Sequence, residues 1–576
     1  MKHCNQRCRA TALDRASSKT AKDGCNSKIQ IAAAKFIWLL ILLLLPQAAR
    51  SGGVVTQCTE ADLRAALAGG GTITFACDGT ILLTSTITNT LDTTLDGRGH
   101  QITISGGDAV RLFCVATNAE FRVLSLTLAA GHDLTGAAIL NLGGRVELSG
   151  VILQTNQASS GGAIGNRGGV IIATDCVFRG NRVFSAGPAG QACGGAVDNE
   201  SGTVELVRCN LTGNSSIGVL NPQPVGMAGA GGAIFNSGTF SAVDCVFSGN
   251  AAAGAPGCFW GDSGGSAWGG AIYNAGLAMF NRCAFASNSA TGGNGLAGSS
   301  GIVVFEQGLP GQNGGSGGAG EGGALYNLGT ATLINCTVAG NTGWGGGGAS
   351  GGNGGGGAAH WGGNGGNGGD GGAGCGGIAG SCQLTNCTLA WNSGHGGTSG
   401  VGGAGGAGIY PGSPGSSGSS GSSVGTSLGS APANILSAAN NPGGSDTITN
   451  ALLRALGNYG GLTPTVALLP GSPAINAGNN AFAPSVDQRN LPRPFGGAVD
   501  LGAYEYATLL QIRRSATDGV EIEVRDALPN QPCRLLTATG LTGWSCVSTN
   551  WVGTNGTTLF QRDATEPQRL FRVAMP

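Results

Sequence analysis

Cysteine and asparagine recur at a fixed spacing through the middle of the chain, and thiols in a row can do chemistry. In seven segments an asparagine follows a cysteine, or in one segment Val151, by five residues. Thiolates bind soft metal ions, and neighbouring thiols can also form disulfides. The cysteines are Cys176, Cys209, Cys245, Cys283, Cys336 and Cys387, and the asparagines are Asn156, Asn181, Asn214, Asn250, Asn288, Asn341 and Asn392.

These residues belong to a longer repeat. Each copy opens with GGAI or a close variant, as at Gly231, and continues to the cysteine and the asparagine. In the copy around Cys245 the apolar side chains of Cys245 and Phe247 alternate with Asp244 and Val246, which is the period of a β-strand. Three short strands in each repeat predict an all-β fold, a right-handed parallel β-helix with one coil per repeat.

The stacking of coils decides between the chemical alternatives. Equivalent residues of successive coils lie about 4.8 Å apart and point in the same direction. Sulfurs in a straight row do not form a tetrahedral metal site, and parallel side chains do not face each other as a disulfide requires. We therefore predict a row of buried free thiols and no metal site. The asparagine row should bond the turn backbone of its own and adjacent coils.

Charged residues suitable for acid–base catalysis are scattered. Asp175, Arg208, Asp244 and Arg282 precede the cysteine in four successive repeats, so we expect an outward-facing ladder of ion pairs. Asp198 with Glu200, and His132 with Asp133, form isolated pairs typical of solvated turns. A polysaccharide lyase or hydrolase would need carboxylates and a basic residue on one strand face. We predict no catalytic residues and no cofactor, and no group of residues supports Ca²⁺.

The loops between the asparagine and the next GG lengthen along the chain, from four residues after Asn156 to about thirty after Asn288 and Asn341. All should leave one corner of the coil and form one face. The late loops are nearly pure glycine, so they are either flexible or packed backbone to backbone. Trp344, His360 and Trp361 lie in these loops as candidate ligand contacts. Their rings either stack on sugars or anchor the loops.

The N-terminal residues predict a helix that caps the β-helix and a signal for export. Residues 59–67 have the pattern of a short amphipathic helix that covers the end of the solenoid, and Cys58 and Cys77 flank it as a predicted disulfide. Residues 1–50 carry a basic stretch, ten apolar residues from Phe36 to Leu45, and small residues beyond them, as in a secretory signal. An uncleaved membrane anchor is the alternative. No later stretch is long enough to span a membrane.

The amino-acid composition argues against nucleic acid as a binding partner. Lysine and arginine number 29 against 30 aspartates and glutamates, so the chain has no basic excess for binding nucleic acid. Eighteen cysteines suit an exported protein. Cys533 and Cys546 are candidates for a second disulfide.

A segment with a different sequence pattern follows the repeats. Between Asn458 and Glu505 the chain contains NYGGLTPT, LPGSPAI, DQRN, RP and DLGAYE in this order. This run resembles the C-terminal signature of bacterial exported right-handed β-helix proteins of the choice-of-anchor Q type. It departs from that pattern at Tyr459, an insertion, and at Asn490, where the family has glycine. The matching residues are Asn458, Gly460, Gly461, Thr463, Pro464, Thr465, Gly471, Ser472, Pro473, Asp487, Gln488, Arg489, Arg493, Pro494, Asp500, Gly502, Ala503, Tyr504 and Glu505.

The resemblance implies a location at the bacterial cell surface and supplies no activity. The repeats are also similar to those of polymorphic outer-membrane proteins. Salt bridges within a C-terminal cap explain Asp487, Arg489, Asp500 and Glu505 better than catalysis does. The expected parts are a signal region (1–50), a β-helix (52–410), a Gly/Ser-rich linker or loop (411–430), a C-terminal β-helix segment (431–506) and a small β-domain (507–576), which is a candidate for sorting or attachment.

Two functions remain open from the sequence. The first is a non-enzymatic adhesion, display or structural protein at the outer cell surface or outside the cell, with polysaccharide or cell-envelope components as partners. The second is a lyase or hydrolase that acts on an acidic glycan along the β-helix face.

Overall fold

The computed structural model describes residues 52–184, 191–219, 226–357, 360–428, 436–438, 447–448, 450–507, 509–514, 519–525, 532–538, 544–553, 557–563 and 570–574. The predicted signal region (1–50) and residues 429–430 of the predicted linker lie outside this set. In the described part of the chain no helix has the length and apolar character needed to cross a membrane.

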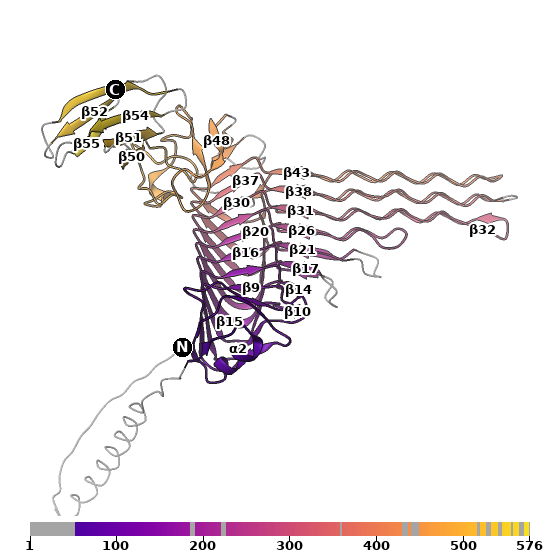
Figure 1. Cartoon of the computed structure of the whole chain (residues 1–576). Helices are drawn as coiled ribbons and strands as arrows, with labels where there is room; N and C mark the ends of the chain where they lie inside the picture. Colours follow the sequence, from indigo (N-terminus) through magenta and orange to yellow (C-terminus); the bar gives the residue numbers. More distant parts are fainter. Residues whose placement is uncertain are drawn as a thin grey trace, which may run out of the picture. The chain divides into compact units, whose positions relative to one another are not determined.

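The repeats form a parallel β-helix, which confirms the predicted fold (Figure 1). Three parallel sheets run along it; the first coils contribute strands to sheets A and B, and the coils from β10 onward contribute to all three. Sheet A consists of β1 (Val54–Val55), β2 (Gly71–Phe75), β4 (Ile87–Asn89), β5 (Thr93–Asp96), β7 (Phe113–Val115), β8 (Glu120–Leu124), β11 (Ile139–Asn141), β12 (Arg145–Ser149), β15 (Ile164–Thr174), β19 (Val197–Val207), β23 (Ile234–Asn236), β24 (Thr239–Val243), β28 (Ile272–Asn274), β29 (Leu277–Asn281), β35 (Leu325–Asn327), β36 (Thr330–Ile334), β40 (Ile378–Gly380), β41 (Gln383–Thr385) and β45 (Ser427–Leu428).

The other two sheets complete the coil. Sheet B consists of β3 (Gly79–Leu82), β6 (Ile102–Ser105), β9 (Thr127–Ala129), β13 (Ile152–Gln154), β16 (Val177–Arg179), β20 (Asn210–Thr212), β25 (Val246–Ser248), β30 (Ala284–Ala286), β37 (Thr337–Ala339), β42 (Thr388–Ala390), β46 (Leu436–Ala438) and β47 (Thr447–Ile448). Sheet C consists of β10 (His132–Thr135), β14 (Gln157–Ser160), β17 (Arg182–Phe184), β18 (Gln191–Cys193), β21 (Ser215–Ile217), β22 (Ala228–Ala230), β26 (Ala251–Ala253), β27 (Ala267–Trp268), β31 (Ser289–Thr291), β34 (Gly320–Glu321), β38 (Thr342–Trp344), β39 (Gly374–Cys375), β43 (Ser393–His395) and β44 (Ser423–Val424).

The coils bend at residues in the left-handed region of backbone space. In the coil that begins at Gly231 these residues are Gly231, Asp244 and Gly249, with φ of 63°, 55° and 61°. The first glycine of the GG pair supplies one bend because it carries no Cβ. Aspartate tolerates the same conformation better than most residues. The bends separate the short strands and close the chain into a coil.

The core is a set of stacked rows. The six ladder cysteines lie in one row, at most 2% exposed, and none is joined to another. Burial raises the pKa of the Cys283 and Cys336 thiols well above its ordinary value, which keeps these side chains neutral. Phenylalanines stack beside them: the Phe247 and Phe285 ring centroids lie 4.9 Å apart with nearly parallel planes.

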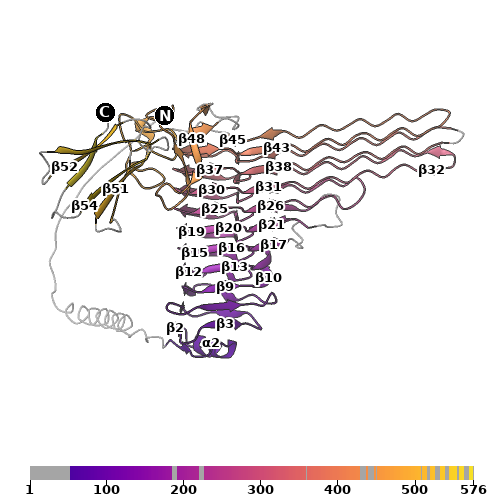
Figure 2. The ribbon, with the colours of Figure 1, turned by 45° about the horizontal axis from the view of Figure 1, so that its top comes forward.

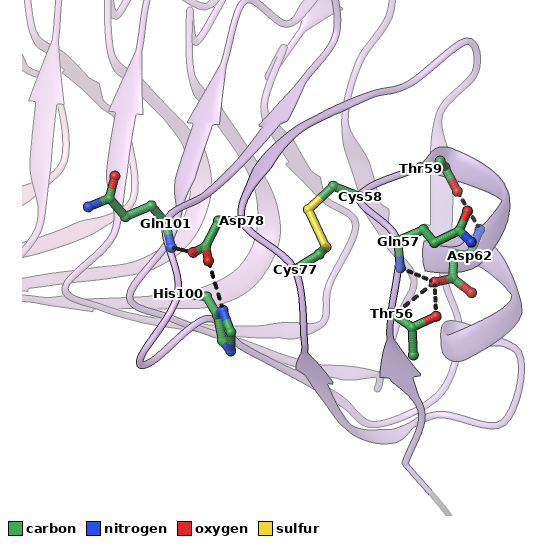
Figure 3. Close-up of a disulfide and its surroundings, with 9 residues drawn as sticks. All are labelled: Thr56, Gln57, Cys58, Thr59, Asp62, Cys77, Asp78, His100 and Gln101. Carbon is green, nitrogen blue, oxygen red and sulfur yellow. Dashed lines mark hydrogen bonds and ion pairs between the residues drawn. A yellow bond between two sulfur atoms is a disulfide. The ribbon is translucent and has the colours of Figure 1, made fainter.

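The N-terminal end is covered as predicted. Helix α2 (Glu60–Leu67) is capped by Thr59, whose hydroxyl accepts a hydrogen bond from the Asp62 N–H, and it buries Leu63 against the first coils. Cys58 and Cys77 are joined by a disulfide that holds this helix to the turn after β2 (Figure 3). The cap therefore rests on both a covalent link and an apolar contact.

The segment 450–507 covers the outer side of sheet B over its late coils. It contains the antiparallel pair β48 (Leu453–Gly457) and β49 (Thr465–Leu468), and the short helix η1 (Asn480–Phe482). The Gln488 side chain accepts a hydrogen bond of 2.6 Å from the Thr337 hydroxyl and donates to the Cys283 carbonyl at 3.4 Å. Thr337 and Thr388 in turn stand at one register position of sheet B, and both are buried under the segment.

Buried charges hold this covering segment together, as expected of the signature residues. The Arg489 side chain donates to the Asp487 carboxylate at 2.8 Å, and its guanidinium lies 3.7 Å from the centroid of the Tyr504 ring. Arg493 and Glu505 form a second pair at 3.3 Å. Burial raises the pKa of Asp500 to about 6. Because the paired side chains are at most 6% exposed, they serve structure and are not open to a substrate.

The C-terminal residues form two antiparallel sheets, which agrees with the predicted small β-domain. One sheet contains β50 (Leu509–Arg514), β51 (Gly519–Arg525) and β54 (Thr558–Asp563), and the other contains β52 (Pro532–Ala538), β53 (Ser545–Trp551) and β55 (Leu570–Ala574). The candidate disulfide between Cys533 and Cys546 is wrong. Cys533 pairs in register with Asn550 and is buried, whereas Cys546 lies opposite Leu536 and is exposed, so the two thiols lie apart on the sheet.

Candidate functional site: the glycine-rich arms

Long arms leave the β-helix from the middle of sheet C. The unbroken strand β14 pairs with two strands of the next coil, β17 through Gln157 and β18 through Ser160. From that coil onward the sheet C strand is split in two and a loop is inserted at the split. We call the three longest loops the arms: 292–319, 345–373 and 396–422. They project side by side from one side of the β-helix (Figure 2), as predicted for the growing loops.

Each arm has an outgoing and a returning limb that follow a three-residue rule. In the returning limb of the second arm, the Gly365 N–H donates to the Ser413 carbonyl of the third arm at 2.8 Å. The next N–H, of Gly366, donates to Gly352 of its own outgoing limb at 2.8 Å. The same pair of bonds recurs three residues on, at Gly368 and Gly369. Three residues per turn without internal hydrogen bonds is the geometry of a polyproline II helix.

In several triplets the third N–H is satisfied by a side chain of the preceding arm. The Asn367 N–H donates to the Asn313 side-chain oxygen at 2.8 Å, and the Ser416 N–H donates to the Asn367 side-chain oxygen at 3.0 Å. Asp370 accepts in the same way from the Ser419 N–H at 2.6 Å. Asparagine, aspartate and serine at the third position therefore accept hydrogen bonds from backbone N–H groups of the next arm.

The glycines are needed for close approach. A methyl group on Gly352 would lie 1.9 Å from the Ser299 carbonyl oxygen, and one on Gly366 would lie 1.9 Å from that of Gln312. None of the described glycines in the arms has a left-handed φ, so backbone freedom is not the reason for them. The sequence left open whether the loops are flexible or packed backbone to backbone, and the structure shows the packed arrangement.

The Gly/Ser-rich segment, predicted as a linker or loop, forms the last limb of the arms. It is the returning limb of the third arm, and its chain re-enters the coil at β44. Each of its triplets keeps one glycine, as at Gly412 and Gly415, whose N–H groups bond the outgoing limb. The triplet position that faces outward holds Pro411 and Pro414. Proline has no N–H to offer a further strand, so it blocks the edge at these two triplets.

Large apolar side chains are gathered at the distal ends of the arms. The first arm ends in a hairpin of β32 (Val303–Val304) and β33 (Gln307–Gly308), where Phe305 is 95% exposed. Trp361 of the second arm and Tyr410 of the third are 60% and 56% exposed. Their ring centroids lie 4.4 Å apart, with the planes stacked. We call these side chains the tip patch: Ile302, Val303, Phe305, Leu309, Trp361, Ile409 and Tyr410.

The structure separates the three aromatic residues predicted as ligand contacts. His360 and Trp361 lie at the end of the second arm, and both are exposed. Trp344 lies at the base of that arm in β38 and stacks on His395 at 3.9 Å. A limb of about twelve residues at 3.1 Å per residue places Trp344 about 40 Å from the tip. The contributions of Phe305 and Tyr410 were missed, although each stands in a short apolar run inside a glycine-rich loop.

Two asparagine ladders run along the β-helix, and only one was predicted. In the predicted row the Asn250 side chain donates to Asn288 at 3.0 Å and to the Leu211 carbonyl at 2.9 Å. The second row stands two residues after the GGAI motif, where the Asn236 side chain donates to that of Asn274 at 2.7 Å. The second row was visible in the sequence as the sixth residue of each GGAI copy: Asn141, Asn166, Asn199, Asn236, Asn274 and Asn327.

The alternating charges form two separate pairs in place of one continuous ladder. Arg208 binds Asp175 through two hydrogen bonds of 2.7 and 2.8 Å, and Arg282 binds Asp244 through bonds of 2.7 and 2.9 Å. Among the described residues no ion pair joins Arg208 to Asp244. All four residues have a left-handed φ of 51–55° because they stand at a bend of the coil.

This geometry gives a test of the coil register. Arg208→Asp places a carboxylate between Asp175 and Asp244, and like charges on adjacent strands destabilise a sheet. Arg208→Asn is the matched control, since asparagine suits the left-handed bend equally well. We expect a lower melting temperature for Arg208→Asp than for Arg208→Asn at low salt. The difference should shrink at about 500 mM salt because screening weakens the repulsion. Equal melting temperatures at low salt would contradict the register.

The other candidate acids are engaged by neighbours. Asp133 pairs with Arg111 at 2.9 Å, and Glu200 pairs with Arg167 at 3.0 Å. Asp198 accepts a hydrogen bond from the Ser160 hydroxyl, and burial raises its pKa to about 6. Within the described ranges no three histidine, cysteine, aspartate or glutamate side chains meet as a metal site. In comparisons with known proteins, neither a family model nor a curated protein matches this chain.

Proposed function

We propose that this chain is an exported adhesion protein of the bacterial cell surface that works without catalysis. The observation that carries the proposal is the tip patch. Its apolar and aromatic side chains are exposed at the far end of arms whose interiors are fixed by backbone hydrogen bonds. Exposed apolar groups on an otherwise polar surface mark contact sites. The arms hold that contact site about 40 Å away from the β-helix.

The charged side chains of the β-helix also favour this function over the enzymatic alternative. Asp175 with Arg208 and Asp244 with Arg282 neutralise each other across neighbouring coils. Glu200 is paired with Arg167 in the same way. A lyase or hydrolase would need such groups directed at a substrate. The resemblance of the 458–505 segment to choice-of-anchor Q proteins supports export and a place at the cell surface.

Adhesion through the tips is tested by replacing the large apolar side chains of the tip patch. In one variant Ile302, Val303, Phe305, Trp361 and Tyr410 are replaced by serine, which leaves the glycine limbs intact. Beads that carry the chain or the variant are measured for retention on intact bacterial cells and on surfaces coated with cell-envelope polysaccharide. We expect retention to fall at least tenfold for the variant. Equal retention, with the limbs still protected from proteolysis, would overturn the proposal.

A further inference from the structure

The stacked rings at the tips form a specific arrangement within the patch. Trp361 and Tyr410 belong to neighbouring arms and lie in register, since an isolated parallel bridge joins the two residues. Tyr410 belongs to the last arm in the described part of the chain, so no further limb covers its outer side. Both rings are more than half exposed. The pair therefore presents aromatic surface to solvent at the corner of the array.

Uncharged polar groups continue inward from the rings on the same face. Asn364 lies one triplet inward from Trp361, and Ser413 lies one triplet inward from Tyr410. The Ser413 N–H donates to the Asn364 side-chain oxygen at 2.9 Å. The next triplet presents Asn367 and Ser416 in the same relation. All four side chains are exposed. A three-residue turn repeats this row about every 9 Å along the limb. The face thus joins aromatic rings to amide and hydroxyl groups.

Charge limits what this face binds. From Ser289 to Ser423, the stretch that contains the three arms, the sequence has no lysine and no arginine. Its charged residues are Glu306, Glu321 and Asp370, all acidic. Anionic ligands such as phosphates or uronates are held by cationic side chains, and the negative arms would repel them. The chemistry of the arms therefore fits an uncharged ligand.

We infer that the arm tips bind a neutral polysaccharide, with Trp361 and Tyr410 as the contact rings. This inference rests on the proposed adhesion function and names its ligand class. A sugar ring has a face of C–H groups that suits an aromatic ring and a rim of hydroxyls that suits amides and hydroxyls. Asn364 and Ser413 are placed to bond that rim, one triplet inward from the rings. The acidic glycan of the enzymatic alternative does not suit these arms.

Binding of defined polysaccharides to the full chain tests the inference. The probes are neutral mannan, dextran and β-glucan, with polygalacturonate and alginate as acidic counterparts. We expect at least one neutral polymer to bind with a Kd that is unchanged between low salt and about 500 mM salt, because no ion pair contributes. Trp361→Ala and Tyr410→Ala should each weaken that binding at least tenfold, and Trp361→Phe should keep most of it. Trp344→Ala is the matched control at the arm base and should change Kd less than twofold.

The outcomes separate the ligand class from the proposed function. Salt-sensitive binding to the acidic polymers alone would overturn the neutral-glycan inference. The neutral-glycan inference would also be overturned if the serine variant lost adhesion but the parent chain bound no neutral polymer. The proposed adhesion through the tips would stand in that case. If Trp344→Ala and Trp361→Ala weakened polysaccharide binding equally, the assignment of the site to the tips would be overturned. Adhesion unaffected in the serine variant would overturn both proposals.

Discussion

The Asn250→Ala variant is expected to lose about 4 kcal/mol of unfolding free energy, among the largest effects of any single side chain in the β-helix. The Asn250 side-chain oxygen accepts from both the backbone N–H and the side-chain amide of Asn214, at 3.0 Å each. Its amide donates to Asn288 and to the Leu211 carbonyl. All of these groups are buried, so the alanine variant leaves donors without acceptors where water does not reach.

Chemical denaturation followed by circular dichroism measures this effect. Asn210→Ala is the matched control, because the Asn210 side chain is exposed and, among the described contacts, accepts a hydrogen bond only from the Thr212 hydroxyl. Asn250→Asp is a sharper probe: it keeps the acceptors and removes the donors, and it should destabilise at least as much as alanine. An Asn250→Ala variant within about 0.5 kcal/mol of the parent chain would show that the ladder does not hold the coils together.

The second large effect is local. Gly366→Ala is expected to open the second arm, because its methyl group would lie 1.9 Å from the Gln312 carbonyl oxygen of the first arm. Overpacking of this kind costs about 3 kcal/mol, which corresponds to roughly a hundredfold faster hydrogen exchange in the limb. The β-helix has its own core, so its melting temperature should change little.

The matched control lies in the same arm. A methyl group on Gly356 would meet no atom closer than the Ala407 carbonyl oxygen at 3.6 Å. Gly356→Ala should therefore leave the exchange rates of the limb within about threefold of the parent. If Gly366→Ala and Gly356→Ala exchange alike, the limbs are not packed backbone to backbone in solution.

The coil could be predicted because its information is local and repeated. The GGAI motif, the cysteine and the asparagine mark the same places in every copy, and their alternation fixes which side faces inward. The charge pattern was only half understood. Asp175 and Arg208 were predicted to face outward in a continuous ladder. Both stand at a bend with a left-handed φ, and the Arg208 guanidinium directs two N–H groups at the single carboxylate of Asp175, so it pairs with one neighbour.

The arms could not be derived in the same way. Their triplet period is visible in the text GGNGGNGGD that ends at Asp370, yet the hydrogen-bond partners of Gly366 stand in two segments that composition does not identify. Trp344 and Trp361 look equivalent in sequence, and only the path of the limb shows that one is at the base and the other at the tip. The error at Cys533 and Cys546 has a similar origin, since strand register decides which residues meet.

The triplet rule restricts how such an array changes in evolution. A limb turns once in three residues, so a single inserted residue would rotate every later side chain out of its place and turn exposed positions such as Asn367 into the crowded interior. A whole triplet inserted in one limb needs a triplet in its partner to keep the antiparallel bonds. Arm length therefore changes in steps of three residues, whereas the turn between β32 and β33, at Phe305 and Glu306, lies outside the strand pairs and can vary without disturbing the register.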